Sequence, residues 1–239
     1  MIRRVLFAAI LAGLVAGIVV TGVQQTRITP LILHAESYEA ATPPAAEGHS
    51  HAHEAAPHSH DAAPHSHDAD AWAPADGIER TAFSLLANVL TAIGFGLLLT
   101  AGFALYGKPV GATKGVLWGL AGFGAFWLAP ALGLPPELPG LQAAELSDRQ
   151  AWYAGTVIAT GGGIAMLAFL RSRAAKGLGA LLILIPHVIG APHPETLGGN
   201  TPPELAAMFV MASLLGAAVL WVVLGGVSGY LYDRLAKTA

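Results

Sequence analysis

Long apolar runs separated by short polar clusters are the dominant pattern along the chain. The runs occupy residues 5–23, 81–106, 115–134, 151–170, 177–190 and 204–232. A helix needs about 20 apolar residues to cross the roughly 30 Å hydrocarbon core of a bilayer. Five of the runs have about that length or more, and the run at 177–190, with 14 residues, is shorter. The pattern therefore predicts an all-α fold, a polytopic bundle of helices in a lipid bilayer.

Composition and motifs narrow the class of protein further. Only 11% of the 239 residues are charged, against about 25% in soluble domains. The net charge of −3 and the lack of a long basic cluster argue against nucleic acid as a partner. Without cysteine, disulfides and thiolate metal sites are excluded. The sequence contains no P-loop, HExxH or nucleophile elbow, so we expect neither an enzyme nor a prosthetic group.

The first apolar run is expected to be a retained membrane helix. It follows Arg3 and Arg4 and has 19 residues, whereas the core of a signal peptide has about 7–15 and ends at an A-x-A-like site. We therefore divide the chain into a first membrane helix at 1–33, a His-rich loop at 34–80 and a helical bundle at 81–239. Most of that loop has no apolar periodicity, so it is predicted to be disordered.

The positions of Lys and Arg favour six membrane segments over five. If 177–190 crosses the membrane, nine basic residues share a face with both termini and three lie opposite; if it is re-entrant, the division is seven to five. Cytoplasmic loops carry the excess of positive charge. We therefore expect both termini in the cytoplasm of a bacterium and the His-rich loop on the periplasmic side of its inner membrane. The nine residues are Arg3, Arg4, Lys108, Lys114, Arg171, Arg173, Lys176, Arg234 and Lys237.

The stretch at 48–70 contains seven of the ten histidines, and the unit APHSHDA occurs in it twice. Alternate residues of an extended chain point the same way, so each His-x-His pair can offer two imidazoles to one ion. Imidazole suits zinc, copper, nickel and cobalt. We expect the stretch to bind such metals, and the alternative is a solvated spacer that responds to pH. The candidate ligands are His49, His51, His53, His58, His60, His65 and His67.

Four further candidate ligands lie where the backbone is more constrained. His187 and His193 lie near the outer end of the short run, and His34 and Glu36 follow the first span, from where they could meet the other pair. A histidine inside a membrane is costly unless paired, and by default it marks an ion pathway. The alternative for His187 is a hydrogen bond to a carbonyl freed by Pro186. We predict that the four form a metal site in an outer vestibule.

Two weaker signals have ordinary explanations beside functional ones. Glycines at four-residue spacing, such as Gly13 with Gly17 and Gly225 with Gly229, allow helices to pack closely. The same spacing could form the face of a homo-oligomer. Glu137, just past the third run, could be a carboxylate at the outer mouth or a solvated loop charge.

Several short motifs, in this order, resemble one known family. They are IRRVLFAAILAGLVAGIV, TPLILHAESYE, the His-rich loop, WLAPALGLPPELPG and IPHVIGAPHP. Over essentially its whole length the chain is similar to the CbtA family of predicted cobalt transporter subunits. The resemblance implies about five spans, a role in cobalt uptake for cobalamin biosynthesis, and a small one-span partner, CbtB, with its own histidine motif. It also implies cobalt, whereas imidazole and carboxylate ligands alone bind nickel and copper at least as well.

These observations lead to one hypothesis and two alternatives. The chain is expected to take up a divalent transition metal, Co²⁺ above all, with the His-rich loop collecting the ion outside and the vestibule residues passing it on. One alternative is a metal-binding or sensing membrane protein that transports nothing. The other is a nickel or zinc transporter of the same design.

Overall fold

The computed structural model describes residues 2–40, 74–194 and 198–237. Within these ranges the chain is helical, and its extended pairing is limited to an isolated β-bridge between Leu141 and Gly199. The predicted all-α fold is therefore confirmed for the described part of the chain.

The helices follow the apolar runs, with shifted ends. Helix α1 (Ile2–Val23) continues through a π-helical turn (Gln24–Ile28) into α2 (Thr29–Ala40). After the His-rich stretch come α3 (Ile78–Tyr106) and α4 (Ala112–Phe123), and a second π-helical turn (Gly124–Leu128) joins α4 to α5 (Ala129–Ala131). The last three helices are α6 (Leu146–Phe169), α7 (Arg173–Ile189) and α8 (Pro203–Lys237).

Local capping explains where α6 and α7 begin. The Glu145 carboxylate accepts hydrogen bonds from the Ser147 hydroxyl and from the Asp148 amide, the latter at 3.1 Å, and these bonds lower the pKa of that carboxyl. The Ser172 hydroxyl accepts from the Ala175 amide at 3.5 Å in the same way. Such caps satisfy N–H groups that have no partner within the helix. As a result, α7 starts four residues before the apolar run and has 17 residues.

Four helices in the described part of the chain are long and apolar enough to cross a membrane. They are Ile2–Tyr38, Ile78–Tyr106, Leu146–Phe169 and Pro203–Lys237. Neither α4 with its continuation nor α7 meets both conditions, since the 17 residues of α7 rise only about 26 Å. The structure thus supports four of the six predicted spans, and the other two remain predictions.

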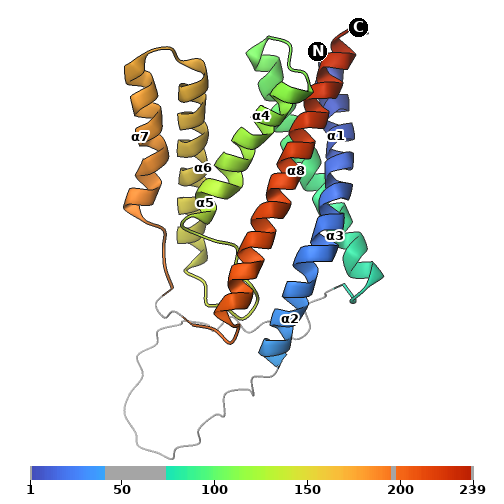
Figure 1. The fold of residues 1–239 in the computed structure, drawn as a ribbon, viewed down its shortest axis with the longest axis vertical. Coiled ribbons are helices and arrows are strands. Elements are labelled where there is room, and N and C mark those ends of the chain that lie inside the picture. The colour runs from blue at the N-terminus through green and yellow to red at the C-terminus, as the bar shows by residue number, and fades with distance from the viewer. Residues whose placement is uncertain (1, 41–73, 195–197, 238–239) are drawn as a thin grey trace, which may run out of the picture.

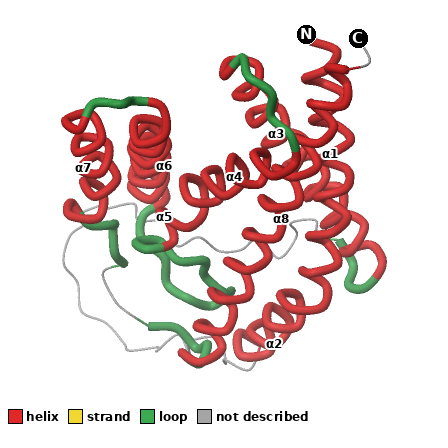
Figure 2. Tube along the Cα trace, turned by 45° about the horizontal axis from the view of Figure 1, so that its top comes forward, coloured by secondary structure: helices red, strands yellow, loops and turns green. Residues whose placement is uncertain are grey.

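The helices run up and down between two ends that differ in charge. Figure 1 shows both termini, the α3–α4 turn and the α6–α7 turn at one end, which we call the basic end because those segments contain the nine basic residues named above. The opposite end has α2, the loop after α5 and the segment before α8, and we call it the histidine end because His34 and His193 lie there. In Figure 2 the α6–α7 hairpin stands to one side of the other helices.

Glycine contacts hold the centre of the bundle together. Gly115 and Gly119 of α4 face Gly225 and Gly229 of α8, and a Cβ atom on Gly115 would lie 2.2 Å from the Gly225 carbonyl oxygen. Likewise a Cβ on Gly17 would lie 2.7 Å from the Cα atom of Val89 in α3. The chain's own helices therefore occupy these glycine faces. The four-residue spacing of the glycines is thus explained by close packing of helices within the chain.

Candidate metal-capture site

The seven histidines of the stretch at 48–70 lie outside the described residues. The structure does describe the two segments that flank this stretch, the end of α2 and the start of α3. Figure 1 places both segments at the histidine end of the bundle.

His34 and Glu36 are part of helix α2, since the helix runs seven residues beyond the expected end at residue 33. Beyond residue 33, Ala35 is fully buried and Tyr38 is partly buried in a cluster that includes Leu205 and Phe209 of α8. This burial accounts for the extension. The His34 ring is exposed and lies 5.4 Å from the Tyr38 ring, centroid to centroid.

Glu36 forms an ion pair at the base of the His-rich stretch. Its carboxylate accepts a hydrogen bond from the Arg80 guanidinium of α3 at 2.8 Å, and Arg80 also contacts Asp76 at 2.9 Å. The pair joins the two described segments that flank residues 41–73 in the sequence. Glu36 is therefore engaged by a cation, and a metal bound there would have to displace the guanidinium.

We expect Glu36→Gln and Arg80→Gln to lower the unfolding temperature by similar amounts, with a double mutant little worse than either. The pair is partly exposed, since the Arg80 side chain is 29% accessible and the Glu36 side chain is 38% accessible. The coupling free energy between the two should therefore be at most about 1 kcal/mol. Thermal unfolding of the four proteins in detergent measures this coupling.

Asp76→Asn is the matched control, because it removes the other ion pair of Arg80. That pair is more exposed, since the Asp76 side chain is 77% accessible. Additive effects of Glu36→Gln and Arg80→Gln would contradict the assignment of Glu36 as a structural partner of Arg80.

His187 lies in the last turn of α7, directly after the buried Pro186. Its half-buried ring lies 6.0 Å from the Trp152 ring of α6. The Pro186 carbonyl accepts hydrogen bonds from the Trp152 indole N–H at 3.3 Å and from the Gly190 amide at 3.1 Å. Figure 1 shows α7 ending well short of the level at which α6 begins, so this turn lies within the height of the bundle.

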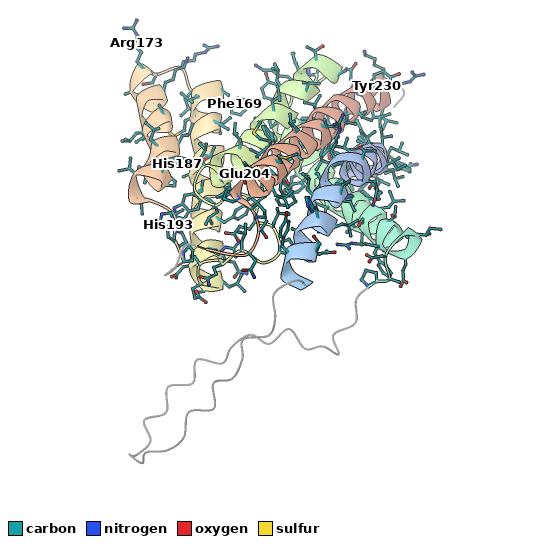
Figure 3. All side chains as sticks on the ribbon, turned by 60° about the horizontal axis from the view of Figure 1, so that its bottom comes forward. Phe169, Arg173, His187, His193, Glu204 and Tyr230 are labelled. Atoms are coloured by element: carbon teal, nitrogen blue, oxygen red, sulfur yellow. The ribbon has the colours of Figure 1, made fainter. Side chains whose placement is uncertain are left out.

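His193 follows in the loop beyond α7 and is exposed. Figure 3 shows His187 and His193 on the α7 side of the molecule, away from Glu204 at the start of α8. Among the described residues, no three His, Asp or Glu side chains come together as a group that could hold a metal ion. The structure therefore does not gather His34, Glu36, His187 and His193 into one coordination sphere.

A cavity of about 470 Å³ lies between the start of α6 and the turn after α5. Its rim contains an ion pair between Glu137 and Arg149, 3.0 Å apart, and its wall includes Phe126 and Tyr153. The Tyr153 hydroxyl donates to the Phe126 carbonyl at 3.1 Å, in the second π-helical turn. Sequence reasoning singled out Glu137 but missed its partner and the cavity, because only the fold places these segments together.

Comparison with known proteins identifies a family. The family model described as "Probable cobalt transporter subunit (CbtA)" matches residues 2–233. No curated protein and no solved structure matches the chain. Because the family match covers nearly the whole sequence, the chain belongs to the CbtA family of probable cobalt transporter subunits.

Proposed function

We propose that this protein is the subunit through which Co²⁺ enters a bacterial cell across the inner membrane. The observation that carries the proposal is the opposite chemistry of the two ends of the bundle. One end contains the nine basic residues, and the other contains His34, Glu36 and His193 and receives both flanks of the His-rich stretch. Under the positive-inside rule the basic end faces the cytoplasm, so the histidines gather metal outside.

In this orientation the chain crosses the membrane six times. The alternating helices of Figure 1 support this count, because the α6–α7 turn reaches the same end as both termini. Helix α7 is the short member and stops within the height of the bundle. Backbone that is not helical at membrane depth is tolerated where it is buried in protein or lines a cavity, as in the broken helices of transporters.

The end of α7 is suited to attract a cation. The C-terminus of a helix has a partial negative charge from its unpaired carbonyls, and the ends of broken membrane helices coordinate cations in known transporters. His187 adds a neutral imidazole to this turn, and His193 follows six residues later. We assign these two residues to the outer part of the ion path, with His34 and Glu36 at the base of the collecting stretch.

His187→Ala is expected to lower the maximal rate of cobalt uptake about tenfold or more, by analogy with the loss caused by removing groups around a metal site. Val188→Ala is the matched control, since its side chain is in the same turn and is 85% exposed. Initial rates of radiolabelled cobalt uptake at saturating metal measure the effect. A normal maximal rate in His187→Ala would refute the role of this residue.

The membrane potential can contribute to the uptake. A potential of 100 mV favours inward movement of a dication by about 4.6 kcal/mol, twice the value for a single charge. The chain has no P-loop, so any nucleotide hydrolysis would have to come from another protein. The family description as a subunit is consistent with a partner, and we propose a small one-span protein of the CbtB type for this role.

Competition among metals tests the choice of ion. In cells that lack other cobalt uptake and express the chain with its partner, nickel and zinc in tenfold excess should leave most uptake of labelled cobalt intact. Equal or stronger competition by nickel or zinc would contradict cobalt preference and favour the alternative of a nickel or zinc transporter.

A further inference from the structure

A second cavity, of about 540 Å³, lies between α6 and the neighbouring helices α3 and α4. Its wall is mainly aliphatic. Leu98 of α3, Leu117 and Ala121 of α4, and Ile164, Ala165 and Ala168 of α6 line it. We call this cavity the α4–α6 cleft.

The cleft results from how α6 is supported. Helix α6 packs closely on α7, where a Cβ atom on Gly163 would lie 2.5 Å from the Gly179 carbonyl oxygen. Toward the histidine end α6 contacts the π-helical turn Gly124–Leu128 and α5, but α4 leans away from it toward the basic end (Figure 1). The space between the diverging helices is thus bounded at the histidine end by direct contact.

Aromatic side chains limit the cleft at its other end. Phe169, at the end of α6, has its ring 5.7 Å from the Tyr106 ring and 5.8 Å from the Trp118 ring. All three residues line the cleft. A membrane-spanning helix has about 20 residues, so a cleft narrowed at both ends by contacts between helices does not fit one.

A positive charge lies at the basic end of this apolar space. Lys114 is the one charged residue among those that line the cleft, and its ammonium donates to the Pro109 carbonyl at 3.3 Å on the exposed surface. Nearby, the Lys108 ammonium lies 5.5 Å from the centre of the Tyr106 ring. The basic end of the cleft therefore has one lysine in its wall, and a second lysine lies beside the lining residue Tyr106.

We propose that the α4–α6 cleft binds an anionic phospholipid from the inner leaflet, with the phosphate at Lys114 and Lys108 and an acyl chain along the cleft. The proposal rests on the membrane orientation proposed above. The volume of the cleft is within the range of about 300–1,000 Å³ that is typical of small-molecule sites. Basic pockets between membrane helices on the cytoplasmic side bind anionic lipid head groups. The apolar wall excludes water, and a lipid can enter sideways between diverging helices. The bound lipid would support the α6–α7 hairpin against the rest of the bundle.

Quenching of tryptophan fluorescence by brominated lipids tests the proposal, because Trp118 lines the cleft. The protein is reconstituted into bilayers with dibrominated phosphatidylglycerol or, separately, dibrominated phosphatidylcholine. The signal of Trp118 is the difference between the wild-type protein and Trp118→Phe. We expect the phosphatidylglycerol to quench this signal with about fivefold higher apparent affinity than the phosphatidylcholine. A factor of this size corresponds to the attraction of about one lysine to an anionic head group.

Lys108→Gln with Lys114→Gln should remove the preference for phosphatidylglycerol while leaving quenching by phosphatidylcholine intact. Lys176→Gln, an exposed lysine of α7 outside the cleft, is the matched control and should keep the preference. Equal quenching by both lipids in the wild-type protein, a preference that survives in the double variant, or no quenching of Trp118 at all would each overturn the proposal. The assay contains no metal, so its outcome is separate from that of the cobalt experiments.

Discussion

Gly225→Leu is expected to prevent the bundle from assembling. A Cβ atom at this position would lie 2.3 Å from the Gly115 carbonyl oxygen and 2.9 Å from the Gly119 Cα atom, both backbone atoms of α4. Backbone in the middle of a packed helix cannot move aside as a side chain can, so α4 and α8 would have to separate. Overpacking a core costs about 1–3 kcal/mol even where neighbours adjust, and here the loss should be greater.

Gly94→Leu is the matched control, because a Cβ at Gly94 of α3 has no heavy atom within 4 Å. Size-exclusion profiles and thermal unfolding in detergent compare the two variants. Gly225→Leu should aggregate or unfold at a much lower temperature, while Gly94→Leu should elute like the wild-type protein. A monodisperse Gly225→Leu of unchanged stability would contradict the contact between α4 and α8.

Deleting residues 48–70 is expected to raise the half-saturation concentration for cobalt uptake about tenfold or more and to leave the maximal rate unchanged. The stretch contains seven histidines, and tethered ligands raise the local concentration of what they bind. When the metal saturates the ion path, a higher local concentration of metal no longer raises the rate of uptake. Uptake rates over a range of cobalt concentrations separate the two parameters.

A second variant tests whether the effect comes from the imidazoles. Replacing all seven histidines with serine keeps the length of the stretch and should reproduce the deletion. If either variant abolishes uptake at saturating cobalt, the stretch belongs to the ion path itself. If the half-saturation concentration is unchanged, the collecting role is wrong.

The sequence predicts the helices better than it predicts where they end. Apolar runs identify the long helices, because a membrane helix must cover its length with apolar side chains. Yet the run ends at Val23, while the helix continues to Ala40. The reason is tertiary: Ala35 is buried and Tyr38 is partly buried in a cluster with Leu205 and Phe209 of α8, more than 150 residues later in the chain.

The same limit applies to the candidate site. Residue type alone identified Glu36 as a candidate ligand, but its partner Arg80 is 44 residues away and only the fold brings the two together. Spacing likewise placed His187 near the outer end of a short run, whereas the structure adds that α7 stops within the height of the bundle, with His187 beside Trp152. The positions of the seven clustered histidines lie outside the described residues and remain predictions from sequence.

Accumulation of cobalt inside proteoliposomes is the most direct test of transport. Purified protein, with its partner where one is required, is reconstituted into sealed vesicles with an inside-negative potential and given radiolabelled Co²⁺. We predict uptake that exceeds the number of metal-binding groups in the protein, depends on the potential and is released by an ionophore for divalent cations. Label that saturates at the binding stoichiometry and is not released by the ionophore would contradict transport and leave a metal-binding membrane protein.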